Sequence, residues 1–351
     1  MNLLVLGGGQ QGRVIATDLA TALPHARVTV ADLRRPELAA LGNLAWVEAD
    51  GADATVLARL MSANDLVVGA LPSRLGYSAM RAAIEARRSM VDVSFSAENP
   101  LTLDSDARRA GVALVPDCGL APGLSHLLLG HAAATHGTPD EAVIYVGGVA
   151  QDATRPFGYV VTWSVDDLLE EFVRPARIQR DGNPAEVPVF SGYERVSFAG
   201  VGEMEAFLSD GLRTLLDTYP EIRDMAEKTL RWPGHIDAIR PLLARGTFVA
   251  TMRAQCSVDP PEDLVVLAVR ARWGSITRET LLVDRYDPAT RHTAMARTTA
   301  LTTSVCAQML AAGLARTPGV NPLERVARDP RAFEFVRDGL ARRGVRFHAA
   351  S

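Results

Sequence analysis

The chain has 351 residues, of which 48% are hydrophobic, so it is long enough for two domains with packed cores. Its formal net charge of −4 gives no general attraction to nucleic acid or to an anionic membrane. No apolar run reaches the roughly 18 residues of a membrane-spanning helix, and the first expected strand leaves no room for a signal peptide. The three widely spaced cysteines fit neither a disulfide framework nor a zinc site. We expect a reduced, cytoplasmic protein that binds no metal, nucleic acid or membrane.

A short apolar strand, residues 2–6, runs directly into a glycine-rich turn. Gly7, Gly9 and Gly12 fit the spacing G-x-G-x-x-G, and a helix is expected from about Gln10. Gly7 permits the tight turn, Gly9 lets a pyrophosphate approach the backbone, and Gly12 lets the helix pack close to the sheet. The helix N-terminus offers unpaired N–H groups to phosphates.

Asp32 stands twenty residues after Gly12, at the end of a second apolar run. Together these features are the dinucleotide-binding fingerprint. A carboxylate here can accept hydrogen bonds from a ribose diol and repels a 2′-phosphate, which predicts NAD rather than NADP. Arg34 and Arg35 can instead hold such a phosphate, and a glycine-rich turn that binds nothing is a third interpretation. The expected cofactor contacts lie in this turn and at strand ends: Gly7, Gly9, Gln10, Gln11, Gly12, Asp32, Leu33, Asp50, Ala70, Leu71 and Pro72.

Regular alternation of strands and helices continues through the first third of the chain. Strands are expected at residues 44–50, 66–71, 90–94 and 112–117, and helices at 53–61, 75–87 and 101–109. This pattern predicts a doubly wound parallel sheet, with ligands beyond the carboxyl ends of the strands. Asp92 and Asp117 end the fifth and sixth strands, where either can hold an ammonium group or relay a proton. The other interpretation of Asp117 is a turn or helix cap.

After Asp117 the pattern changes to a mixed α+β domain. The dipeptide Asp181-Gly182 predicts a hairpin turn. We expect strands at residues 248–257, 264–273 and 277–286, and helices at 124–134, 165–172, 204–217, 235–243 and 295–315. The segment 321–347 is expected to supply a short helix and strand that return to the first domain. The expected domains are residues 1–123 (dinucleotide binding), 124–291 (substrate binding and dimerisation) and 292–351 (the returning segment).

Five segments resemble a known family: residues 115–123 (VPDCGLAPG), 145–148 (YVGG), 204–207 (MEAF), 228–235 (KTLRWPGH) and 293–300 (TAMARTTA). On these the chain resembles the saccharopine dehydrogenase family, and most closely its L-lysine 6-dehydrogenase type. The resemblance implies an N-terminal Rossmann domain completed by C-terminal helices, with an inserted α+β domain that binds an amino acid. It also implies a homodimer or a dimer of dimers.

The implied reaction takes a hydride from an amine-bearing carbon to NAD and leaves an imine that water hydrolyses. In the lysine type the ε-amine leaves as ammonia. The loop of residues 94–98 departs from that type, in which glycines and a histidine are expected, so the substrate can differ. Two other functions stay open: a reductase that condenses an aldehyde with an amino acid, and a non-catalytic NAD(H)-binding sensor or scaffold.

The segment 228–235 carries three candidate site residues. Arg231 is the first candidate to anchor a substrate carboxylate, because the matching arginine of saccharopine reductases serves the substrate and a guanidinium fork suits a carboxylate. His235 can act as an acid or base near neutral pH, or simply begin a helix. Lys228, the only lysine, can be a base if burial lowers its pKa, or can form a salt bridge.

Trp163 and Ser164 resemble a pair that lines the substrate pocket of the reductases, although a core tryptophan is the alternative. Tyr193 and the adjacent Glu194 are candidates for the same pocket. The predicted catalytic residues are therefore His235, Asp92, Asp117 and Lys228, and the predicted substrate-binding residues are Arg231, Trp163, Ser164 and Tyr193.

Overall fold

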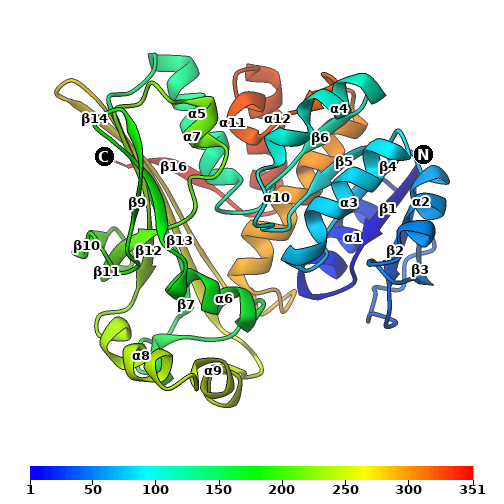
Figure 1. Cartoon of the computed structure of the whole chain (residues 1–351). Helices are drawn as coiled ribbons and strands as arrows, with labels where there is room; N and C mark the ends of the chain where they lie inside the picture. Colours follow the sequence, from blue (N-terminus) through cyan, green and yellow to red (C-terminus); the bar gives the residue numbers. More distant parts are fainter. Residues whose placement is uncertain (351) are drawn as a thin grey trace. The chain divides into compact units, whose positions relative to one another are not determined.

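The structure is a computed structural model that describes residues 1–350. It divides into two compact units (Figure 1). The first unit comprises Met1–His131 and Thr299–Gly344, and the second comprises Ala132–Thr298 and the chain from Val345 on. Each unit has its own sheet and is described by itself below.

The first unit is built on a seven-stranded sheet in the order β15-β6-β5-β4-β1-β2-β3, with every neighbouring pair parallel. This confirms the predicted doubly wound Rossmann sheet. Its strands are β1 (Asn2–Leu6), β2 (Arg27–Asp32), β3 (Leu44–Glu48), β4 (Leu66–Gly69), β5 (Ser89–Asp92), β6 (Ala113–Val115) and β15 (Gly319–Val320). Its helices are α1 (Gln10–Ala22), α2 (Ala54–Ser62), α3 (Ser73–Glu85), α4 (Asp104–Ala110), α11 (Leu323–Val326) and α12 (Pro330–Arg342), together with the larger parts of α5 (Leu124–His136) and α10 (Ala294–Ala311).

The central strands are buried on both faces, which explains their continuous apolar sequences. On one face of the sheet, the side chains of Leu4, Leu6, Val67 and Leu114 pack against residues of α2, α3 and α4. On α1, the carboxylate of Asp18 joins helices from the end of the chain. It accepts hydrogen bonds from Ser304 Oγ (2.6 Å), Gln308 Nε2 (3.2 Å) and Arg343 Nε (2.6 Å), on or just beyond α10 (Ala294–Ala311) and α12. C-terminal helices therefore complete this unit, as predicted.

The second unit holds a nine-stranded mixed sheet with a path β10-β11-β12-β7-β13-β14-β16, from which the β8–β9 hairpin extends beside β12. Its strands are β7 (Glu141–Ala150), β8 (Ala176–Arg180), β9 (Asn183–Val187), β10 (Glu194–Phe198), β11 (Gly202–Ser209), β12 (Asp224–Arg231), β13 (Asp263–Trp273), β14 (Ile276–Arg285) and β16 (Phe347–Ala350). Its helices are α6 (Val165–Val173), α7 (Leu215–Thr218), α8 (His235–Ala244) and α9 (Phe248–Cys256). Two short 3-10 helices cover Pro100–Leu103 in the first unit and Pro156–Gly158 in the second.

The predicted hairpin turn is confirmed between β8 and β9. Asp181 and Gly182 both have positive φ, 49° and 76°, which is the backbone conformation that an Asp-Gly turn favours.

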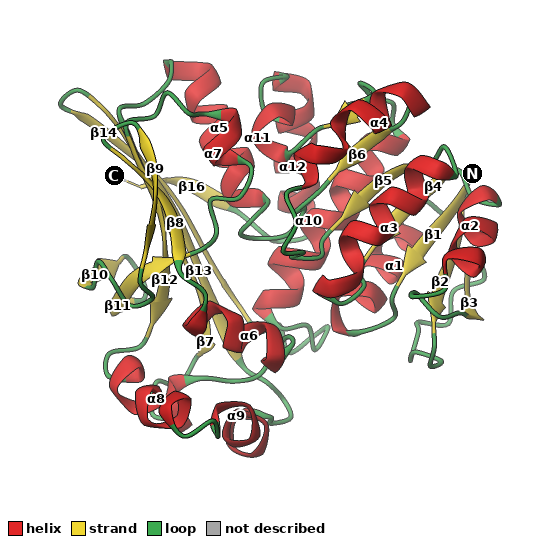
Figure 2. Cartoon of the chain, in the orientation of Figure 1, coloured by secondary structure: helices red, strands yellow, loops and turns green. Residues whose placement is uncertain are grey.

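Two element predictions were wrong, as Figure 2 shows. The helix expected at residues 204–217 is strand β11 followed by the short α7, because Met204 and Ala206 face one core while Phe207 faces another, the alternation of a strand. The strand expected at residues 248–257 is helix α9. Its buried residues Phe248, Met252 and Cys256 recur every four positions and form one helical face.

The chain's end also differs from expectation. The helices α11 and α12 belong to the first unit, but the final strand β16 pairs antiparallel with β14 in the second sheet. Within residues 1–350, no helix is both long and apolar enough to cross a membrane.

Candidate functional site

The glycine-rich turn between β1 and α1 has the geometry of a phosphate cradle. Gly7 has φ +94°, and a Cβ at Gly7 or Gly12 would collide with backbone, that of Ala70 or of Gly7 respectively. Gly9 is different, since an added Cβ there would meet no described atom within 4 Å. The fold itself therefore needs Gly7 and Gly12, whereas the space over Gly9 suits a ligand that approaches the backbone closely.

Helix α1 begins at this turn without a side-chain cap. Gly9 is its N-cap residue, and the first turn holds no acidic residue. The N-terminal N–H groups and the positive end of the helix dipole are thus available to an anion. Gln11 Oε1 is buried and has no hydrogen-bond partner among the described residues, so a hydrogen bond from a ligand would satisfy it. These observations fit a dinucleotide.

Asp32 ends β2 and closes the turn. Its Oδ2 accepts a hydrogen bond from the Gly8 N–H (2.7 Å), and its Oδ1 accepts one from the Arg34 N–H (2.8 Å). The carboxylate therefore braces the loop in addition to the predicted ribose contact. Arg34 and Arg35 are exposed beside it.

The other predicted cofactor residues lie at the carboxyl ends of the strands. Ala70, Leu71 and Pro72 follow β4 and precede α3, with Pro72 as its N-cap residue. Asp50 follows β3 and is exposed, and Leu33 follows β2 with 61% of its surface exposed. The topology thus brings the predicted set to one edge of the sheet, although Asp50 Oδ1 also accepts a bond from the Ala52 N–H (2.8 Å).

Asp92 ends β5 at the same edge and is 1% exposed. Its Oδ2 accepts hydrogen bonds from the hydroxyl and the backbone N–H of Ser94, while its Oδ1 has no hydrogen-bond partner within residues 1–350. A side chain at Gly69 would collide with Oδ1, and one at Gly76 would collide with Ser94. Burial raises the pKa of Asp92 to about 7, against the lowering effect of Ser94 and with a further increase from nearby Asp117.

Asp117 is buried and has φ 51°, in the turn that follows β6. The next residue, Cys118, forms two backbone hydrogen bonds. Its N–H donates to Asp92 O (2.8 Å), and its carbonyl accepts from Thr303 Oγ1 of α10 (2.8 Å). The structure therefore brings the two predicted carboxylates together at the ends of adjacent strands. Burial raises the pKa of the Cys118 thiol well above its usual value, which disfavours the thiolate form.

The predicted substrate residues lie in the second unit. Arg231 ends β12 and is only 3% exposed. Its Nη2 forms an ion pair with Glu171 Oε2 of α6 (2.7 Å), its Nη1 donates to Leu230 O (2.8 Å), and its Nε has no hydrogen-bond partner among the described residues. The guanidinium carbon lies 5.5 Å from the ring centroids of both Tyr159 and Phe172. Contacts within the second unit therefore fix the position of the Arg231 side chain.

His235 begins α8 and is 3% exposed. Its Nδ1 hydrogen-bonds Phe157 O (2.7 Å), which assigns the proton to Nδ1, and its Nε2 has no partner within the described chain. Burial and, to a smaller extent, the charge of Arg231 lower the pKa of His235 to about 3, and the hydrogen bond with Phe157 O opposes this shift. A histidine that is neutral at pH 7 with so low a pKa is poorly suited to the predicted acid–base role.

Trp163 and Ser164 lie directly before α6. The Trp163 indole N–H donates to the Tyr159 hydroxyl (3.0 Å), which connects it to the ring beside Arg231. Ser164 is the exposed N-cap of α6, and its Oγ accepts a bond from the Asp167 N–H (3.2 Å). Trp163 therefore contacts Tyr159, whose ring lies next to Arg231, whereas Ser164 caps helix α6.

Lys228 and Tyr193 lie elsewhere in the second unit. Lys228 Nζ forms an ion pair with Glu194 Oε1 (2.6 Å) and donates to Gly192 O (2.9 Å), so its salt bridge is present. Glu194 also accepts a bond from the Tyr145 hydroxyl (3.0 Å). Tyr193 is 50% exposed and its hydroxyl accepts a bond from Arg195.

Sequence reasoning missed several members of these clusters. The sequence places Ser94 at the carboxyl end of the fifth strand, but its hydrogen bonds to Asp92 were not predicted, although a hydroxyl two residues after an aspartate is a recognisable hydrogen-bonding pattern. Glu171 and Tyr159 are sixty and seventy-two positions before Arg231. No local pattern indicates that they meet it.

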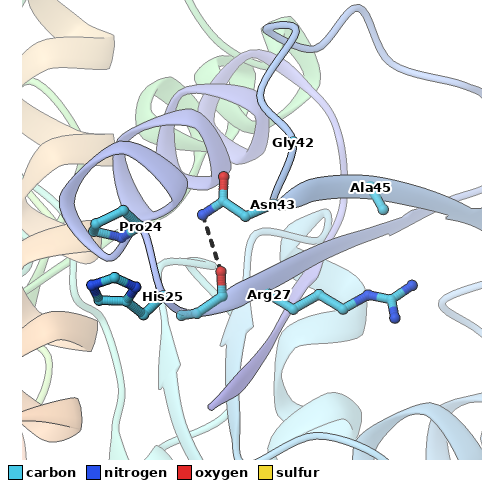
Figure 3. A pocket seen from close by; sticks show the side chains of 7 residues that line it. Pro24, His25, Arg27, Gly42, Asn43 and Ala45 are labelled. Carbon is cyan, nitrogen blue, oxygen red and sulfur yellow. Dashed lines mark hydrogen bonds between the residues drawn. The ribbon is translucent and has the colours of Figure 1, made fainter.

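A separate hollow of about 380 Å³ lies at the amino ends of β2 and β3 (Figure 3). It is lined by Pro24, His25, Ala26, Arg27, Gly42, Asn43 and Ala45. Asn43 Nδ2 donates to Ala26 O (3.0 Å) and to two further carbonyls, so this side chain fastens the loop. The hollow is at the opposite edge of the sheet from the glycine-rich turn. Within the described part of the chain, no group of three or more His, Cys, Asp or Glu is arranged to hold a metal ion.

Two family sequence models match this chain. Residues 3–115 match the saccharopine dehydrogenase NADP binding domain, and residues 119–345 match the saccharopine dehydrogenase C-terminal domain.

Named relatives agree with these matches. A saccharopine dehydrogenase (NADP+, L-glutamate-forming) of Saccharomyces cerevisiae is 24% identical over 266 residues, which cover 70% of this chain and 58% of that protein. The mitochondrial alpha-aminoadipic semialdehyde synthase of Mus musculus is 29% identical over 137 residues, covering 37% of this chain and 15% of that protein. The matched regions thus span less than two thirds of these relatives. The structure of apo saccharopine dehydrogenase (L-Glu forming) from Saccharomyces cerevisiae covers 100% of both chains with a TM-score of 0.77 at 18% identity, which shows the same fold.

Proposed function

This chain belongs to the saccharopine dehydrogenase family, and we propose that it is an oxidoreductase that uses a nicotinamide dinucleotide to oxidise or form a carbon–nitrogen bond in an amino acid. The observation that carries the proposal is the cradle at Gly9, where the turn leaves space over the backbone at the uncapped N-terminus of α1. Buried carboxylates at the ends of β5 and β6 stand at the same edge of the sheet.

The proposal assigns a role to each of the candidate site residues in the first unit. The N–H groups of α1 hold the pyrophosphate, and Asp32 fixes the loop that faces the adenosine ribose. A bound nicotinamide ring supplies the hydride acceptor or donor. Asp92 takes the proton from the substrate nitrogen in the oxidative direction, because a carboxyl group with a pKa of about 7 exchanges protons readily near neutral pH. Ser94 holds the carboxylate and Asp117 adds negative charge that attracts an ammonium group.

The substrate is proposed to be an α-amino acid with a second nitrogen on its side chain. L-lysine is the first candidate because the resembling segments are most like the L-lysine 6-dehydrogenase type. Saccharopine, in which that nitrogen is secondary, is the second candidate, and the similarity to saccharopine dehydrogenases supports it. Both substrates undergo the same hydride step at a carbon bearing nitrogen.

The form of the cofactor is a separate question. The matched domain and the named relatives favour NADP, and exposed Arg34 and Arg35 supply positive charge for a 2′-phosphate. The prediction of NAD rests on the negative charge of Asp32. Because Asp32 already accepts two backbone hydrogen bonds, both oxygens have a structural role that does not depend on a ribose.

The test is to incubate purified protein with each oxidised cofactor and either L-lysine or saccharopine, and to follow absorbance of the reduced nicotinamide. The reverse assay supplies the reduced cofactor with an amino-acid semialdehyde and glutamate. Turnover in one direction with one pair identifies the substrate and the cofactor. Cofactor binding without turnover in any assay would contradict the proposal and leave a nucleotide sensor as the function.

A further inference from the structure

We propose that Glu171 is an internal carboxylate that occupies Arg231 and must be displaced by the carboxylate of the substrate, so that Glu171 sets the affinity for substrate. This inference rests on the proposed function and on the sequence-based prediction that Arg231 anchors the carboxylate of the substrate. Glu171 Oε2 lies 2.7 Å from Arg231 Nη2. The pair lies wholly within the second unit.

The ion pair uses only part of the guanidinium. Glu171 contacts Nη2 alone, Nη1 is satisfied by Leu230 O, and Nε is buried without a hydrogen-bond partner among the residues described. A carboxylate binds arginine most strongly when its two oxygens accept two parallel N–H bonds. The observed arrangement therefore leaves one donor unused, and a ligand that reaches both Nε and Nη2 would satisfy the fork better than Glu171 does.

The surroundings favour exchange of one carboxylate for another. The Arg231 guanidinium packs against the rings of both Tyr159 and Phe172, which helps to fix its position. Its side chain is 4% exposed, whereas the Glu171 side chain is 29% exposed. Glu171 is thus the member of the pair that reaches solvent. When it turns outward, its place beside Arg231 can be taken only by another anion, because a buried guanidinium left unpaired is costly.

This arrangement selects the ligand by charge. An incoming molecule must carry a carboxylate to compensate Arg231, so amines without a carboxylate gain nothing at this position. The competing internal carboxylate also lowers affinity for every carboxylate ligand by the same factor. Replacing Glu171 with glutamine keeps the size and one hydrogen-bonding oxygen but removes the competing charge.

The experiment measures binding of glutarate by calorimetry to the full chain and to Glu171→Gln. Pentane-1,5-diamine, which has the same chain length and opposite charge, is the control ligand. Glu170→Gln is the matched control variant, because Glu170 lies on the same helix with a side chain that is 51% exposed and pairs with Arg174. The double variant Glu171→Gln/Arg231→Gln tests whether any gain requires Arg231. Circular dichroism checks that each variant is folded.

We expect glutarate to bind Glu171→Gln at least five-fold more tightly than either the unchanged chain or Glu170→Gln, with no gain for the diamine and none in the double variant. Equal affinities, a gain that persists without Arg231, or no detectable glutarate binding would each overturn the inference. Because binding is measured without turnover, a gain in a protein that shows no turnover in either direction would support the competing role of Glu171 while contradicting the proposed function. Turnover combined with unchanged glutarate binding would do the opposite.

Discussion

The carboxyl group of Asp92 and the side chain of Ser94 form one buried unit at the end of β5. Ser94 donates to Asp92 Oδ2 through both its hydroxyl and its backbone N–H. The absence of side chains at Gly69 and Gly76 makes room for this pair between β4, β5 and α3. A carboxyl group with an adjacent hydroxyl, placed at the strand ends and with a pKa near neutrality, has the properties of a group that exchanges protons.

The raised pKa of Asp92 predicts a pH-dependent stability. The folded pKa of about 7 lies above the ordinary value of 3.8, so the folded state binds this proton more tightly than the unfolded state. Stability from this group is complete below about pH 3.8 and is lost as pH rises through 7. Asp92→Asn, measured by thermal unfolding, should therefore gain stability relative to the unchanged protein as pH rises from 5 to 8, by a few kcal/mol at most. A constant difference across this range would contradict the burial argument.

Gly9 and Gly12 should respond differently to alanine, although they belong to one motif. A Cβ at Gly9 meets no described atom within 4 Å, so Gly9→Ala should fold with a melting temperature close to that of the unchanged protein. It should lose about ten-fold or more in affinity for the reduced cofactor, because the methyl group takes the space of the pyrophosphate. Gly12→Ala should instead unfold more easily, because its Cβ collides with Gly7 O. Fluorescence titration and thermal unfolding check the pair, and equal cofactor affinity in Gly9→Ala would contradict the cradle.

The first unit was largely predictable because its signals are local. Short stretches of sequence are enough to recognise the apolar strands, the glycine spacing and the acids Asp32, Asp92 and Asp117. The parallel topology then places these residues at the carboxyl ends of the strands. The second unit was less predictable. Residues 204–209 and 248–256 were assigned the wrong element, because apolar residues in short windows suit either period until burial on a particular face decides between them.

The contacts of Arg231 show why the rest of the candidate site was not predictable. The segment 228–235 was recognised, but its partners Tyr159, Phe172 and Glu171 come from distant segments. Only the fold brings them together. The state of His235 likewise depends on burial and on a backbone carbonyl, neither of which sequence spacing reports.

Removing the charge of Asp32 should shift the preference between the two cofactors. Asp32→Ser keeps a short hydrogen-bonding side chain near the Gly8 N–H but no longer repels a 2′-phosphate, while Arg34 and Arg35 remain beside it. The ratio of the dissociation constant for NADPH to that for NADH should fall by about ten-fold or more, since one removed like-charge contact is worth on the order of 1–2 kcal/mol. Arg34→Ser should raise the same ratio. If neither variant changes it, this loop does not select the cofactor.

His235 should affect acid stability without controlling the pH dependence of turnover. Its folded pKa of about 3 lies below the ordinary 6.5, so the unfolded state binds the proton more tightly, and stability from this group is present above pH 6.5 and lost as pH falls toward 3. His235→Gln should therefore become relatively more stable than the unchanged protein as pH decreases through this window. If Asp92 is the acid–base group, turnover should show a midpoint near pH 7, and that midpoint should remain in His235→Gln. Loss of that midpoint would instead restore His235 as the acid–base group.

Lys228 is expected to stabilise the second unit rather than to act as the base. Its ammonium group forms an ion pair with the Glu194 carboxylate (2.6 Å) and donates a hydrogen bond to Gly192 O (2.9 Å), so both contacts are structural. Burial raises the pKa of Glu194, but the hydrogen bond and charge of Lys228 outweigh this and hold the pKa below its usual value. Lys228→Met should lower stability by about 1–2 kcal/mol in chemical denaturation, because Glu194 loses its partner but remains partly exposed. The same variant should retain kcat within about two-fold, and Lys228→Arg should recover most of the lost stability. A kcat reduced by a factor of a hundred or more in Lys228→Met, in protein shown to be folded, would mean that Lys228 is the base after all.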